Sequence, residues 1–120
     1  MADYDAVKKA LEDALDPELQ DEVIATSISA DTDIFDSDLE APANGFWLFQ
    51  LTTDTASYPK VKLTPAGSGT SVTSGLNESG NLTANSWYEF WMAAKEGDKI
   101  NVQFSAAATV TVRVFFVRSS

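Results

Sequence analysis

The side chains with the clearest capacity for chemistry are five carboxylates that fall within ten positions, from Asp31 to Glu40. Calcium prefers several oxygen ligands of this kind. The spacing does not fit an EF-hand loop, because its fifth position would be Phe35 and its twelfth Pro42. Two interpretations stay open, a calcium site and a solvated acidic loop that places Ile34 and Phe35 inward. We favour the second and expect no bound metal.

Residue types that commonly act in catalysis are scarce. The 120 residues contain no histidine and no cysteine, which removes the commonest general base and the thiol nucleophile together. Glu89 lies between Trp87 and Trp91, but a glycosidase would need a second carboxylate that the sequence does not place beside it. We therefore expect no catalytic residue, no cofactor and no enzymatic activity, with Glu89 an exposed or interfacial residue.

The negative charge is concentrated at one end of the chain. Residues 1–40 hold 13 of the 18 acidic residues and only two lysines, whereas residues 41–120 hold five acids and six bases. A nucleic-acid-binding chain needs a basic stripe, and none is present. No stretch approaches the roughly 18 apolar residues of a membrane span, and the N-terminus does not resemble a signal peptide. We expect a soluble protein made in the cytoplasm that binds neither nucleic acid nor membrane.

Residues 1–22 are predicted to form an acidic helical arm. Its apolar side chains recur at spacings of three and four and make one stripe: Tyr4, Val7, Leu11 and Leu15. Pro17 should end this helix, and a short second turn is expected over residues 17–22. Because a helix of about 13 residues is marginal alone in water, the stripe must pack against its own sheet or against a partner. Both alternatives stay open.

Residues 23–120 show the alternating pattern of an all-β domain. Strands are expected at 23–30, 46–52, 60–64, 71–74, 87–93, 99–105 and 110–117. Turn signals every 8 to 12 residues are typical of a sandwich or a barrel. The last two of these strands each place their apolar side chains on one face, which predicts the core: Ile100, Val102, Phe104, Val110, Val112, Val114 and Phe116.

Several strands also carry apolar residues on a second face. Trp87 and Trp91 lie opposite Tyr88, Phe90 and Met92, and Phe115 and Val117 lie opposite the predicted core set of the last strand. Likewise, Trp47, Phe49 and Leu51 lie opposite Phe46 and Leu48. Such a face implies a covered surface. The second apolar face can be an oligomer interface, a surface covered by the N-terminal helix, or a surface on which sugars stack. We favour the oligomer interface. The candidate interface residues are Tyr4, Val7, Leu11, Leu15, Trp87, Trp91, Phe115 and Val117.

Four short motifs stand out between Leu76 and Val117: LNESGNLTANSWYEF ending at Phe90, EGDKIN ending at Asn101, Phe104-Ser105 and Thr109-Val110. In these motifs the chain resembles small virion proteins of tailed phages. The likeness covers about a third of the chain and leaves out the acidic arm. The resemblance implies a jelly-roll or related β-sandwich that trimerises and sits on the capsid as a decoration protein, or that forms a spike or fibre knob.

Together these observations predict a mainly β fold, a jelly-roll-like antiparallel sandwich of seven or eight strands after a short amphipathic helix. The arm would span residues 1–22 and the β domain residues 23–120. The expected function is a non-enzymatic capsid decoration (cement) protein, a homotrimer on the major capsid protein or another virion protein. The alternative is a carbohydrate-binding module whose stacking platforms would be Trp47, Trp87, Trp91 or Tyr58.

Overall fold

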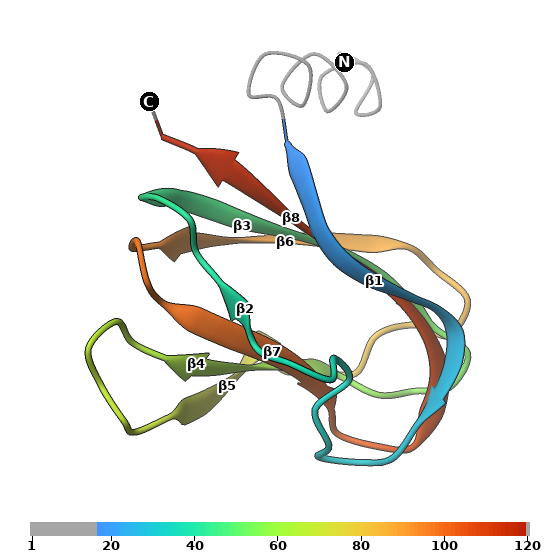
Figure 1. The fold of residues 1–120 in the computed structure, drawn as a ribbon. Helices are drawn as coiled ribbons and strands as arrows, with labels where there is room; N and C mark the ends of the chain where they lie inside the picture. The colour runs from blue at the N-terminus through green and yellow to red at the C-terminus, as the bar shows by residue number, and fades with distance from the viewer. Residues whose placement is uncertain (1–16, 120) are drawn as a thin grey trace.

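The computed structural model describes residues 17–119, which form eight β-strands and no helix. The strands are β1 (Glu18–Ile28), β2 (Leu39–Glu40), β3 (Gly45–Thr53), β4 (Pro59–Thr64), β5 (Val72–Ser79), β6 (Tyr88–Ala94), β7 (Lys99–Phe104) and β8 (Ala108–Arg118). They make two four-stranded antiparallel sheets that face each other (Figure 1). The mainly β sandwich expected from the alternation is therefore confirmed.

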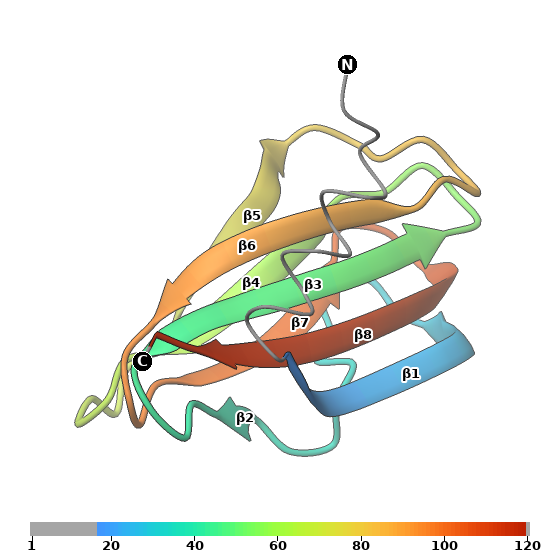
Figure 2. The same ribbon diagram turned by 90° about the horizontal axis from the view of Figure 1, so that it is seen from above.

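The strand order in the two sheets is β1-β8-β3-β6 and β2-β7-β4-β5, called here the 1-8-3-6 sheet and the 2-7-4-5 sheet. The first strand pairs with the last, the second with the seventh, the third with the sixth and the fourth with the fifth. A long hairpin of four such pairs, rolled so that successive pairs alternate between two sheets, is the jelly-roll arrangement. In Figure 2 the strands of the 1-8-3-6 sheet lie side by side in the order β1, β8, β3 and β6.

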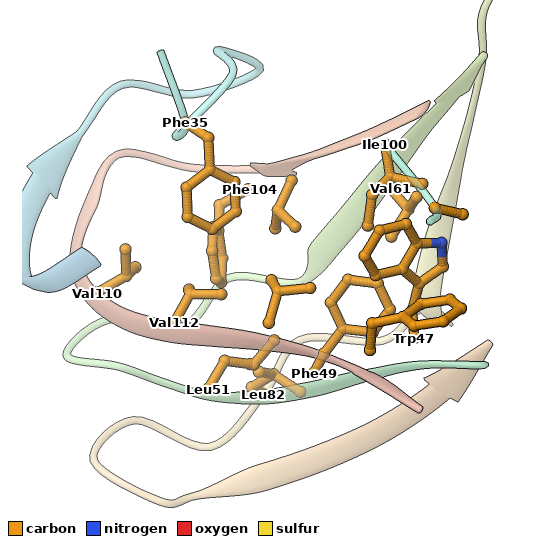
Figure 3. Packing of buried hydrophobic residues seen from close by; sticks show 14 residues of the cluster. Phe35, Trp47, Phe49, Leu51, Val61, Leu82, Ile100, Phe104, Val110 and Val112 are labelled. Atoms are coloured by element: carbon orange, nitrogen blue, oxygen red, sulfur yellow. The ribbon is translucent and has the colours of Figure 1, made fainter. Parts of the chain in front are cut away.

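The core lies between the two sheets and is built from one face of each strand. In β7 and β8 it contains the alternate residues that the sequence predicted, all at most 1% exposed: Ile100, Val102, Phe104, Val110, Val112, Val114 and Phe116. From β3 it takes Trp47, Phe49 and Leu51 (Figure 3). The Trp47 ring meets the Phe116 ring edge to face, with 5.3 Å between their centroids. Tyr88 and Phe90 pack against this core from β6, as their alternation predicts.

Three local expectations fail or lie outside the described residues. The short helical turn expected over 17–22 is wrong, because β1 begins at Glu18 and pairs with β8 from its first residue. Pairing with an existing strand satisfies the backbone there and overrides the local preference for a turn. The helical stripe of Tyr4, Val7, Leu11 and Leu15 lies outside the described residues. The edge strand expected at 71–74 continues to Ser79, and the two-residue β2 was not predicted.

Strand β1 is irregular, which alters its face pattern. Its register against β8 shifts twice, between Leu19 and Asp21 and between Val23 and Thr26, and Ala25 has a φ of 46°. Each shift is a β-bulge. Because the second bulge adds a residue, Ile24 is 59% exposed, although strict alternation would place it on the same face as Ile28, which packs against the core.

Candidate docking surface

The outer face of the 1-8-3-6 sheet, turned away from the core, carries a set of apolar side chains. We call it the docking face: Leu19, Phe46, Leu48, Trp87, Trp91, Phe115 and Val117. One row crosses all four strands, because Leu19 pairs with Phe115, Phe115 with Leu48, and Leu48 with Trp91. A second, shorter row joins Val117 to Phe46. The pairing thus brings residues from both ends of the chain onto one surface.

Four residues of the predicted interface are described by the structure, and all four lie on this face: Trp87, Trp91, Phe115 and Val117. Their exposed fractions differ. Trp87 is 57% exposed and Trp91 is 39% exposed, whereas Phe115 is half-buried. Val117 is only 1% exposed, although it is not part of the core cluster. The tryptophans are therefore the accessible part of the predicted set, and Val117 is already covered.

Sequence reasoning missed three members of the docking face. Phe46 is 43% exposed and Leu48 only 1%, and both lie on the β3 face opposite Trp47 and Phe49. Their signal was present in the sequence, since β3 is apolar on both faces, but alternation does not say which face is the core. Leu19 was assigned to a helical turn, so its place beside Phe115 could not be anticipated.

The end of the docking face nearest Trp87 is polar and tied together by directed contacts. The Arg113 guanidinium lies 5.6 Å from the centre of the Trp87 ring, and its Nε donates to Glu22 Oε2 at 3.1 Å. One strand further along, Gln50 Nε2 donates to Glu89 Oε2 at 2.9 Å. A cation held over an indole and fixed by a carboxylate gives a rigid, amphipathic patch of the kind enriched where proteins bind partners.

The aromatic residues considered for sugar stacking fall into two groups. Trp47 is fully buried in the core, so it offers no platform, and its indole N–H has no hydrogen-bond partner. Trp87 and Trp91 keep exposed rings, and Tyr58 is half-buried. Only the two tryptophans of the docking face remain as stacking candidates with substantial accessible area.

An apolar hollow of about 230 Å³ opens between β5 and β6, beside the docking face. Its lining is mainly apolar: Val61, Leu63, Val72, Leu76, Trp91 and Met92. Val72 is 57% exposed although its partner Leu63 packs against the core, so the two sheets part along this side. The hollow is smaller than the roughly 300 Å³ at which ligand pockets commonly begin.

The acidic loop runs along the β7 edge of the other sheet, because the Asp31 N–H donates to the Phe104 carbonyl and the Ile34 N–H to the Val102 carbonyl. Its carboxylates meet two lysines of β4. Lys60 pairs with Asp31, and Lys62 pairs with Asp33 at 2.5 Å and with Asp38 at 3.6 Å. Within residues 17–119 there is no group of three or more acidic side chains arranged to hold a metal ion. The lysines occupy the positions where a cation would neutralise these carboxylates.

Asn101 fixes the acidic loop to the sheet. The side chain is 1% exposed, and its amide both accepts from the Phe35 N–H at 3.1 Å and donates to the Phe35 carbonyl at 3.0 Å. The same amide nitrogen donates to Asp38 Oδ1 at 3.0 Å. Phe35 is held 4% exposed in the core, as the sequence predicted for the inward side of this loop.

The pair between Asp33 and Lys62 shifts both ionisation equilibria. Burial raises the pKa of Asp33, but hydrogen bonds from Gln103 and Lys62 outweigh this and hold that pKa below its usual value. The hydrogen bond to Asp33 raises the pKa of Lys62, against a smaller opposing effect of burial. Each group thus favours the charged form of the other.

Comparison with known proteins yields likeness of fold only. No protein-family model matches the sequence, and no curated protein matches it. The crystal structure of the T13 infectious bursal disease virus particle matches 84% of this chain and 30% of its own chain, at 11% identity and a TM-score of 0.49. Structures of the Gx and Gt strains match at 12% and 11% identity and a TM-score of 0.42 each.

The chain spans about a third of the length of these viral chains. At such low identities and TM-scores, these matches carry no argument about function. A proposal on function therefore has to rest on the residues of this chain. In residues 17–119 no helix is long and apolar enough to cross a membrane.

Proposed function

We propose that this chain is a non-enzymatic structural protein of a virus particle, a decoration protein that assembles as a homotrimer and binds the capsid surface of a tailed phage. The observation that carries the proposal is the docking face, where four large apolar side chains stay substantially exposed on the outer side of the sandwich: Leu19, Phe46, Trp87 and Trp91. Its most exposed tryptophan, Trp87, is backed by Arg113. The major capsid protein, or another virion protein, is the proposed partner.

The strand order supports this proposal. Jelly rolls with this pattern of two Greek keys occur in viral capsid domains, and also in lectins and cupins. A fold shared by several functions cannot decide among them. The docking face favours a protein-binding role over the other functions of this fold, because protein interfaces are enriched at their centres in Trp, Arg and other large side chains.

A trimer suits the placement of the exposed apolar residues. Closed rings use interfaces in which one patch of a subunit meets a different patch of the next. Large exposed apolar side chains occur on the docking face and also at Val72, beside the hollow between β5 and β6. Two separate apolar patches on one subunit satisfy the requirement for such a ring.

The test of the proposal combines native mass with binding to capsids. Native mass spectrometry at micromolar concentration should give three times the chain mass, and the purified protein should cosediment with capsids stripped of their accessory proteins. Trp87→Ala should reduce cosedimentation about tenfold or more, as for a residue at the centre of an interface. Ile24→Ala is the matched control, because Ile24 is exposed to a similar extent, 59%, and belongs to neither apolar patch.

Two results would overturn the proposal, one for the trimer and one for the decoration role. A monomeric mass at this concentration removes the trimer. Equal cosedimentation of the wild-type protein with capsids and with an unrelated particle removes the decoration role.

The second candidate function is carbohydrate binding, favoured by the exposed rings of Trp87 and Trp91. Both come from the same side of the sheet, where flat rings can stack on sugars. Titration with an oligosaccharide panel should then change the tryptophan emission of the wild-type protein but not of the double variant Trp87→Ala, Trp91→Ala. An unchanged wild-type emission across the panel would exclude this function.

A further inference from the structure

Strand β6 lies at an edge of the 1-8-3-6 sheet, with β3 on one side and no strand of residues 17–119 paired to it on the other (Figure 2). It is regular over its seven residues, Tyr88–Ala94, and pairs with β3 without a register shift. Alternate residues of an edge strand direct their N–H and C=O groups away from the sheet. The outer side of β6 can therefore hydrogen-bond a further extended strand.

The segment that contains β6 is self-complementary in charge. Glu89 lies near the start of the strand, and Lys95 follows directly after its end. By the strand period, both belong to the same side of the sheet as Trp91. Two antiparallel copies of this segment run in opposite directions, so the acid of each can face the base of the other. Opposite charges that face each other across neighbouring strands stabilise the pairing.

The pleat limits the registers in which two copies of β6 can pair. Residues directly opposite each other in neighbouring antiparallel strands point to the same side of the sheet. A twofold pair must therefore place odd-numbered residues opposite odd-numbered ones. The register centred on Met92 places Glu89 opposite the partner's Lys95. A shift of this centre by one residue, in either direction, separates the two charges.

The same register also matches side chains by size. Trp91 faces the partner's Ala93 on the outer side of the sheet, and Phe90 faces a second small residue, the partner's Ala94, on the inner side. Trp91 is 39% exposed and Ala93 is also exposed, so both are accessible to a second copy. At the centre, Met92 meets the partner's Met92 beside the apolar hollow that it lines, and methionine adapts well to irregular space.

We propose that the edge of β6 binds a second copy of this chain, antiparallel and edge to edge, with Met92 on the twofold axis and Glu89 opposite the partner's Lys95. Each 1-8-3-6 sheet then continues into that of its partner. Because strands of seven residues make a small contact, and small interfaces are weak, we expect the pairing near millimolar concentration. The inference goes beyond the proposed function, since it requires neither a trimer nor a capsid.

Sedimentation equilibrium of the full chain tests the pairing. The average mass should at least double between low micromolar and near-millimolar concentration. Lys95→Glu should weaken this association about tenfold, because the twofold axis then brings an acid opposite an acid at two places. The double variant Glu89→Lys, Lys95→Glu exchanges the two charges and should restore it. Lys99→Glu is the matched control, since this exposed lysine lies on the other sheet and changes the net charge equally.

A cysteine variant tests the register directly and covers the case in which the double variant, which loses the Gln50–Glu89 hydrogen bond, folds poorly. The sequence contains no cysteine of its own. Near millimolar concentration, Met92→Cys with oxidised glutathione should give a disulfide-linked dimer several-fold faster than Ala93→Cys. Ala93 is more exposed than Met92, but in this register two residues 93 are diagonal neighbours, about 7–8 Å apart and beyond the reach of a disulfide.

Three results would overturn the proposal. A mass that does not change with concentration removes the pairing. Equal effects of Lys95→Glu and Lys99→Glu remove the contact between Glu89 and Lys95, and faster linking of Ala93→Cys than of Met92→Cys removes the register. None of these results bears on the trimer or on capsid binding, which the mass at low micromolar concentration and the cosedimentation decide.

Discussion

On the outer face of the 2-7-4-5 sheet, the carboxylates of the acidic loop are matched by Lys60 and Lys62, and the buried Asn101 amide fixes the loop to β7. On the outer face of the 1-8-3-6 sheet, by contrast, side chains as large as Trp87 and Phe46 remain partly exposed. The polar groups on the outer face of the 2-7-4-5 sheet bind one another, whereas the outer face of the 1-8-3-6 sheet keeps apolar surface exposed to solvent. Association with a partner gains most from the second face, because burying apolar area there costs little polar desolvation.

The largest effect expected from this contrast is on Leu48. Leu48→Ala should lower the free energy of unfolding by about 3 kcal/mol, as for a core leucine, because the residue is covered although it lies on the outer side of its sheet. Urea denaturation measures this, with Trp91→Ala on the neighbouring strand as the more exposed comparison. If Leu48→Ala lowers the free energy of unfolding by less than about 1 kcal/mol, the Leu48 side chain is exposed to solvent.

Removal of the Asn101 amide should come next. Asn101→Ala leaves the Phe35 N–H and carbonyl without their recorded side-chain partners in a buried site, which should cost about 2 kcal/mol. The control is Gln103→Ala, which removes an amide that donates to the Asp33 carboxylate and not to the backbone of Phe35. If both variants unfold at the same urea concentration, the loop is not fixed to the sheet through Asn101.

A smaller, pH-dependent effect is expected for Asp33→Asn. The folded pKa of Asp33 lies below its unfolded value of 3.8, so its stabilisation is present above that pH and is lost as the pH falls through the folded pKa. The pKa of Lys62 is raised above 10.5, so its share is lost as the pH rises through that folded value. At pH 7 we expect a loss of about 0.5–1 kcal/mol, since the pair is partly exposed and screened.

The difference in stability between wild-type and Asp33→Asn protein should therefore shrink toward pH 3 and again above pH 11, relative to pH 7. Asp36→Asn, at an exposed position in the same loop, serves as the control. A difference that is constant from pH 3 to pH 7 would show that the hydrogen bonds, and not the charge of Asp33, carry the effect.

The smallest effect on folding is expected for Arg113→Ala. Its ion pair with Glu22 and its contact with the Trp87 ring are both substantially exposed, so the loss of stability should stay under about 1 kcal/mol. Thermal unfolding in low and high salt measures it, and the loss should be smaller in high salt. A loss of several kcal/mol would mean that this end of the docking face belongs to the folding core and not to a site kept for a partner.

Alternation of side chains was enough to predict the sandwich, because period-two patterns in β7 and β8 leave only one choice of inner face. It was not enough for β3, where Phe46 and Leu48 are as apolar as Trp47 and Phe49, and only the packed sheets show which set is inside. The strand order could not be predicted from the alternation, because it depends on contacts between segments that are distant in the sequence. The bulged β1 was misjudged at both ends for the same reason: its bounds and its phase are set by pairing with β8.

The bulges of β1 also limit how the sheets could grow. Of the strands at the sheet edges that the structure describes, β1 carries two register shifts, β2 has two residues, and β5 contains Glu78 with a φ of 52°. Strand β6 alone offers a regular run of seven residues at an edge. A fibre built by strand addition needs two compatible edges on each molecule, and a molecule with one can join a single copy before growth stops. The fold is therefore suited to assemblies of finite size at high local concentration.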